Sequence, residues 1–97
     1  MNFEVDNEKE RGWILRILNR TYPDPLDIDT VKKQLVDLRF LTNESDIRGN
    51  VAYLNEKGLL KTEEVGSGAV KRTVVALTAN GKDLIDGAIP DVIGVSL

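Results

Sequence analysis

The residues of this sequence that could do chemistry are basic side chains in its middle and in its second half. Arg48 lies inside a segment with helical spacing, and Lys61, Lys71 and Arg72 lie in two β-rich segments that follow it. An arginine can donate two hydrogen bonds to a guanine, and surface lysines and arginines bind phosphates. This combination indicates contact with nucleic acid.

The sequence offers little for catalysis or metal binding. Its 97 residues include no Cys and no His, which removes thiol chemistry, the usual general base and the commonest metal ligand. Asp24, Asp27 and Asp29 lie close together but lack the glycine-containing loop of a calcium site, and Asp27 is better explained as a helix cap. Gly66-Ser67-Gly68 is too short for a phosphate-binding loop. We therefore expect no enzyme, no cofactor and no metal.

A predicted helix positions Arg48. It begins after Thr42 or Asn43, both good N-caps, and ends before Gly58. Its core side is a stripe of apolar residues at helical spacing: Ile47, Val51 and Leu54. At about 100° per residue, the opposite side holds Glu56 and most of the predicted DNA contacts, with the last of these contacts, Tyr53, beside them: Ser45, Arg48, Gly49, Ala52 and Tyr53. The two smallest of these residues would let the helix lie deep in a major groove.

The charge of this helix argues in the other direction. Residues 43–57 contain three acids against two bases, a net charge of −1, and the whole chain has a net charge of −3. Residues 11–82 are mildly basic, with twelve Lys and Arg against nine Asp and Glu. DNA-binding surfaces are usually more basic, so a solvated or protein-binding surface is the alternative interpretation.

A β-hairpin is predicted to follow the helix. Residues 59–65 and 69–77 are rich in β-branched and apolar residues. Gly66-Ser67-Gly68 is expected to join the two strands as the hairpin loop. Such a hairpin would form a wing beside the helix that carries Arg48.

Five further basic residues complete the predicted DNA contacts: Lys32, Lys33, Lys61, Lys71 and Arg72. The last three lie on the hairpin, where they would bind phosphates or enter the minor groove. Lys32 and Lys33 lie in a preceding helix that would touch the DNA backbone. Glu63 and Glu64 favour an alternative, in which cross-strand Lys–Glu pairs keep an exposed hairpin soluble.

Other elements are expected around this helix and hairpin. A first helix runs from a cap at Asp6 to about residue 20, and Gly12 inside it marks a close approach of another backbone. Asp27 caps a second helix, and a short strand near Leu26 pairs with the hairpin. The second helix is expected to direct three residues into the core: Val31, Leu35 and Leu38.

The C-terminal part is predicted to hold a short helix and an apolar tail. Thr78 can cap a helix that runs through Asp86 and stops at Gly87. Residues 88–97 contain five large aliphatic side chains and one charge. Exposed apolar surface of this kind is unusual, so the tail is expected to pack on the body or on a second subunit.

Two segments resemble known regulators. Residues 45–60, which include Leu54-x-x-x-Gly58-Leu59, resemble the recognition helix and the start of the wing in bacterial winged helix-turn-helix regulators. Repressors of the multiple-antibiotic-resistance and arsenical-resistance families carry a similar ending, and the Leu-Thr-Ala-Asn-Gly at 77–81 is similar to the motif after their wing. A nearer resemblance is to small winged-helix proteins of Mu-like phages and prophages, on Arg-Gly-Trp-Ile-Leu at 11–15 and on residues 77–94. This resemblance implies a phage-derived winged helix.

Together these observations predict one α+β domain with a winged helix-turn-helix fold. We expect an N-terminal arm (1–6), the winged helix (7–87) and the apolar tail (88–97). The expected function is a DNA-binding transcriptional regulator of phage or prophage origin, which binds double-stranded DNA as a cytoplasmic homodimer. No apolar run is long enough to span a membrane. The alternative is a winged-helix adaptor that binds a protein partner and no DNA.

Overall fold

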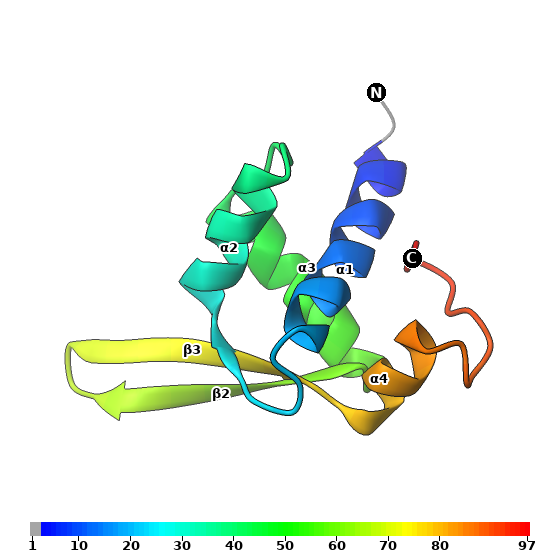
Figure 1. Ribbon diagram of the computed structural model, residues 1–97. Helices are drawn as coiled ribbons and strands as arrows, with labels where there is room; N and C mark the ends of the chain where they lie inside the picture. Colours follow the sequence, from blue (N-terminus) through cyan, green and yellow to red (C-terminus); the bar gives the residue numbers. More distant parts are fainter. Residues whose placement is uncertain (1–2) are drawn as a thin grey trace.

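The fold places three helices above a long β-hairpin, with a fourth helix and the tail at one end (Figure 1). This computed structural model describes residues 3–97. Its elements in chain order are α1 (Phe3–Asn19), β1 (Leu26–Asp27), α2 (Ile28–Asp37), α3 (Glu44–Glu56), β2 (Leu60–Ser67), β3 (Val70–Leu77) and α4 (Ala79–Ile85). The predicted α+β winged helix-turn-helix fold is confirmed. None of the described helices is long and apolar enough to cross a membrane.

The core lies between the apolar sides of α1, α2 and α3 and the adjoining ends of β2 and β3. Its fully buried residues come from all of these elements: Ile14, Leu15, Leu18, Val31, Leu35, Ile47, Leu54, Leu60 and Val75. Burying one such side chain stabilises a fold by about 1.5–3 kcal/mol. The prediction for Leu38 is wrong, because this residue ends α2 as its C-cap and is 39% exposed.

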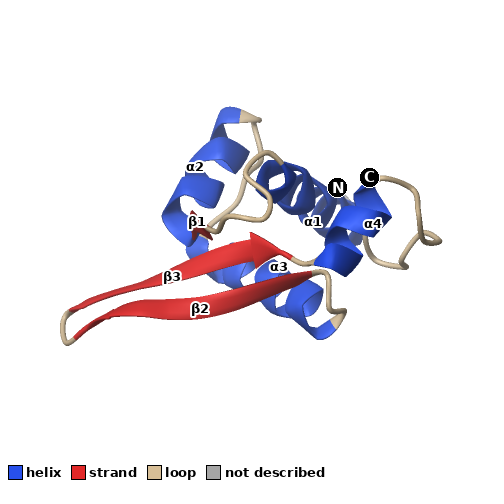
Figure 2. Ribbon diagram, turned by 60° about the horizontal axis from the view of Figure 1, so that its bottom comes forward, coloured by secondary structure: helices blue, strands red, loops and turns tan. Residues whose placement is uncertain are grey.

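The sheet has the order β1-β3-β2, and all of its strand pairs are antiparallel (Figure 2). The short strand expected near Leu26 is confirmed, because Leu26 pairs with Val75 and Asp27 with Val74. Since α2 begins directly after β1, this pairing fixes the start of α2 against the wing.

The hairpin turn is shorter than predicted. β2 continues through Ser67, which pairs with Val70, and only residues 68–69 form the turn. Gly68 has a φ of 61°, a conformation that two-residue hairpin turns favour. Gly66 and Ser67 therefore extend the strand, and the predicted three-residue loop is wrong.

Side-chain caps fix the starts of three helices. Asp27, Asn43 and Thr78 each accept a hydrogen bond from a backbone N–H in the first turn, at 2.9, 2.9 and 3.1 Å. Replacing such a cap with alanine typically costs about 1 kcal/mol. The caps predicted for α2 and α4 are confirmed, and Asn43 is the cap of α3.

α1 begins earlier than predicted. It starts at Phe3, so Asp6 lies inside the helix and does not cap it. The helix therefore includes residues 3–6 of the predicted arm, and residues 1–2 lie outside the described part of the chain.

The tail, residues 88–97, folds back beside α1 (Figure 1). Three of its residues pack against the core: Ile89, Val92 and Val95. The Ser96 N–H donates a hydrogen bond to the Glu8 carbonyl at 3.1 Å. A Cβ at Gly12 would collide with the Ser96 carbonyl, so the predicted close backbone approach at Gly12 is confirmed.

Candidate nucleic-acid interface

The candidate interface is the side of α3 that faces away from the core, together with the neighbouring wing. Ser45, Gly49 and Ala52 are exposed there, as the helical spacing predicted. Outside α3 itself, no described residue comes within 4 Å of the point where a Gly49 side chain would begin. This stretch of α3 is therefore narrow and open to solvent, as a helix that enters a groove must be.

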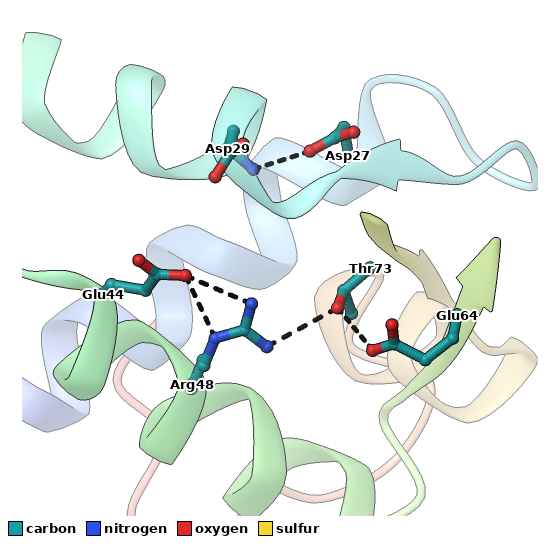
Figure 3. A network of polar contacts seen from close by, with 6 residues as sticks. All are labelled: Asp27, Asp29, Glu44, Arg48, Glu64 and Thr73. Atoms are coloured by element: carbon teal, nitrogen blue, oxygen red, sulfur yellow. Dashed lines mark hydrogen bonds and ion pairs between the residues drawn. The ribbon is translucent and has the colours of Figure 1, made fainter. Parts of the chain in front are cut away.

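Arg48 lies on this exposed side but turns toward the wing (Figure 3). Its Nε and Nη2 donate hydrogen bonds to one carboxylate oxygen of Glu44, one helical turn earlier, at 3.3 and 3.2 Å. Its Nη1 donates to the Thr73 hydroxyl on β3 at 3.5 Å. The guanidinium thus joins α3 to β3, although the Arg48 side chain is 50% exposed.

Thr73 links this guanidinium to a second carboxylate. It is itself buried, and its hydroxyl donates a hydrogen bond to Glu64 at 2.6 Å. Glu64 lies directly opposite Thr73 on β2. We call Glu44, Arg48, Glu64 and Thr73 the wing-side cluster. Sequence spacing does not identify the two wing residues, because only the strand register brings them to α3.

Tyr53 faces the tail and lies apart from the exposed contacts of α3. The Arg11 guanidinium stacks over its ring at 3.8 Å from the ring centre, and its hydroxyl donates to the Ile93 carbonyl at 2.9 Å. The side chain is half-buried. These contacts tie α3 to α1 and to the tail, so we leave Tyr53 out of the proposed interface.

Asn50 is a buried residue of α3 that lies beside Arg11. It is 3% exposed, its amide donates to the buried Glu10 carboxylate, and its amide oxygen accepts from Arg11 Nε at 2.9 Å. Arg11 Nη1 also donates to the Gly94 carbonyl at 3.1 Å. We call Glu10, Arg11, Asn50 and Tyr53 the α1-side cluster. Its burial and its mutual hydrogen bonds indicate a structural role.

The register of the wing decides which charges meet across it. Lys71 lies opposite Gly66, and Arg72 lies opposite Val65. The register therefore places no lysine of the hairpin directly opposite a glutamate, so it gives no support to the alternative of cross-strand Lys–Glu pairs. Neither Glu63 nor Glu64 forms an ion pair with a described residue.

The basic residues of the wing divide between its two faces, because side chains alternate along a strand. Lys71 shares a face with Thr73, which contacts α3 through Arg48. Lys61 and Arg72 lie on the other face, since Lys61 pairs with Ala76. Arg72 Nε approaches the Asp27 carboxylate there at 3.8 Å. Among the three predicted wing contacts, Lys71 therefore lies on the same face as the wing-side cluster, and Lys61 and Arg72 do not.

α2 contributes the remaining predicted contacts. Lys33 is exposed and Lys32 is half-buried. Neither lysine forms an ion pair within the part of the chain that the structure describes. Both charges are therefore free to meet a phosphate.

Three of the solved structures that match this chain share its fold. A PadR family transcription regulator from hypervirulent Clostridium difficile R20291 has a TM-score of 0.68 and 20% identity, covering 81% of this chain and 81% of that chain. A PadR-like transcription factor from Bacteroides fragilis has a TM-score of 0.63 and 19% identity, covering 78% and 75%. A PadR family transcriptional regulator from Eggerthella lenta DSM 2243 has a TM-score of 0.63 and 20% identity, covering 81% and 70%.

These similarities concern the fold. No protein-family model matches the chain, and no curated protein matches it. At this level of identity, the solved structures establish that the chain is a winged helix of the same architecture. They do not establish its function, because one fold can serve several functions.

Proposed function

We propose that this protein is a DNA-binding transcription regulator, in which α3 enters the major groove and the wing contacts the phosphate backbone. The observation that carries the proposal is the exposed side of α3, where Gly49 and Ala52 leave room for base edges beside Arg48. Ser45 adds a small hydroxyl on the same side. Lys33 on α2 and Lys71 on the wing supply cations for phosphates.

The structural neighbours support this proposal, since each of the three is described as a transcription regulator or transcription factor. The proposal has two further parts. The resemblance of the sequence to Mu-like phage proteins supports a phage or prophage origin. Because the proposed target is DNA, we expect the protein to act in the cytoplasm.

We also propose that the protein acts as a homodimer. Ile93 is 90% exposed and Leu97 is 42% exposed, although both belong to a tail whose other aliphatic residues pack inward. A second copy that covers these residues would remove apolar surface from water. Sedimentation velocity measures this directly, and a monomer at high concentration would contradict it.

The test is selection of a binding site from random duplexes, followed by two variants. Arg48→Ala should cost about 1–3 kcal/mol on the selected site and relax the preference at one base pair. Lys71→Ala should weaken binding to all duplexes alike and reduce the salt dependence by about one phosphate contact. The measurement is affinity against salt concentration on the selected and the random duplex.

A protein-binding adaptor is the second candidate, and one observation favours it. Arg48 is already paired with Glu44, and residues 43–57 have a net charge of −1, with three acids against two bases. Such a surface suits a basic protein partner better than a phosphate. If selection enriches no site, or if both variants bind DNA like the wild type, the adaptor replaces the regulator.

A further inference from the structure

The guanidinium of Arg48 is held by contacts within the protein, and these contacts affect how it can bind DNA. All three guanidinium nitrogens are engaged within the protein, Nε and Nη2 by Glu44 and Nη1 by Thr73. A bidentate contact with guanine needs two nitrogens of the same guanidinium. Glu44 occupies the Nε–Nη2 edge of the guanidinium, so Arg48 has to give up Glu44 before this edge reaches a base. A guanidinium has five N–H groups, so one further N–H remains on Nη1 and one on Nη2, and a ligand bound to these two lies close to the Glu44 carboxylate.

We propose that Glu44 is a specificity-determining residue, which keeps Arg48 from binding phosphates at random positions on DNA. This inference rests on the proposed DNA-binding function. A phosphate that binds Arg48 lies beside the Glu44 carboxylate, whether it displaces Glu44 or uses the remaining N–H groups, and the two anions repel each other. A guanine is uncharged and gains two directed hydrogen bonds in either position. Binding of Arg48 is therefore favoured at the correct base and disfavoured along the backbone.

Thr73 and Glu64 hold the other end of the guanidinium. The Thr73 hydroxyl has one proton, which it donates to Glu64 at 2.6 Å, so its lone pairs remain for Arg48. Thr73 thus acts as a positioning residue, and it keeps Arg48 against the wing (Figure 3).

The exposure of the Arg48–Glu44 pair makes this exchange feasible. The Arg48 side chain is 50% exposed and the Glu44 side chain is 60% exposed. Ion pairs in such positions contribute little to stability, because water and salt screen them. Arg48 can therefore change partners without disturbing the fold.

Salt-dependent binding to a random duplex tests the role of Glu44. In the wild type Arg48 should add no phosphate contact to this non-specific binding. Glu44→Gln frees the guanidinium, so the slope of log affinity against log salt should steepen by about 0.9, the value for one extra phosphate. The double variant Glu44→Gln/Arg48→Ala should return to the wild-type slope. Glu44→Gln should also lower the ratio of affinities for the selected and the random duplex.

Glu56→Gln is the matched control, because it removes the same charge from the exposed surface of the same helix. Glu56 forms no ion pair within the described part of the chain. This variant should raise non-specific affinity slightly through general electrostatics and keep the wild-type slope. Thermal unfolding of all variants shows that each one is folded.

The outcomes separate the two proposals. If the wild type binds DNA but Glu44→Gln behaves like Glu56→Gln, the role of Glu44 is overturned and the DNA-binding function stands. A steeper slope that persists in the double variant also overturns it, because Arg48 is then not the group released. If neither the wild type nor any variant binds a duplex at low salt, the proposed function fails, and the role of Glu44 fails with it.

Discussion

α3 carries two polar clusters on different sides, and they differ most in burial. In the wing-side cluster Arg48 and Glu44 are each at least half exposed in their side chains. In the α1-side cluster Glu10 and Asn50 are 4% and 3% exposed. Both clusters contain an arginine, a carboxylate and a neutral hydrogen-bonding partner, so the chemistry is nearly the same on the two sides.

The difference teaches what a polar cluster on one helix can do. A buried hydrogen-bonded group costs about 1–3 kcal/mol when its partner is lost, so the α1-side cluster holds α3 in one place. An exposed ion pair contributes about 0–1 kcal/mol, so the wing-side cluster can change partners at little cost, as the proposed recognition of DNA requires. In this proposal the α1-side cluster anchors α3, and the wing-side cluster recognises DNA.

The largest expected effect separates the clusters directly. Asn50→Ala removes the hydrogen bonds that Asn50 forms with the buried Glu10 carboxylate and with Arg11 Nε, so it should lower the free energy of unfolding by about 1–3 kcal/mol. Arg48→Ala removes an exposed ion pair and one long hydrogen bond to Thr73, whose hydroxyl keeps its bond to Glu64, so it should stay within about 0.5 kcal/mol of the wild type. Urea unfolding of both variants measures this. Equal losses would mean that the two clusters contribute alike to stability.

A second comparison uses two helical glycines. Gly12→Ala in α1 would push a Cβ into the Ser96 carbonyl, so it should destabilise the protein by about 1–3 kcal/mol or detach the end of the tail. Gly49→Ala in α3 meets open space and should stabilise the helix by about 0.5–1 kcal/mol. Thermal unfolding measures both changes, and hydrogen exchange at Ser96 detects the detached tail. A stabilised Gly12→Ala, together with rapid exchange of the Ser96 amide in the wild type, would show that the tail does not pack against α1 in solution.

The sequence predicts most of the fold because the signals for its elements are local. Cap residues, apolar spacing and glycine stops act within a few residues, and they correctly placed the starts of α2, α3 and α4 and the ends of α3 and α4. The hairpin turn was misplaced because Gly66 and Gly68 flank one serine and both take a positive φ. The left-handed conformation of Arg39 after α2, with a φ of 71°, could not be predicted from the sequence, because glycine or asparagine normally occupies this position.

The candidate site was predictable only where it depends on a single helix. Helical spacing placed Ser45, Gly49 and Ala52 on the exposed side of α3, and they are exposed. The contact between Arg48 and Thr73 joins residues 25 positions apart, and it depends on the register of β3 and the packing of the wing. The same holds for Tyr53, whose neighbours come from α1 and the tail. Periodicity within one element contains no information about such partners.

The smallest expected effect is at Tyr53. Tyr53→Phe keeps the ring beneath Arg11 and removes only the hydroxyl that donates to the Ile93 carbonyl. It should therefore cost about 0.5–1.5 kcal/mol, the contribution of one hydrogen bond, and leave DNA affinity unchanged because the hydroxyl is occupied by the tail. Arg48→Ala should show the reverse, with wild-type stability and weakened binding to the selected site. Urea unfolding and DNA titration of the two variants, measured side by side, test whether the α1-side cluster affects stability alone and the wing-side cluster affects DNA binding alone. Weaker DNA binding by Tyr53→Phe at full stability would place the phenol hydroxyl in the interface, and the division between anchoring and recognition would then fail at this residue.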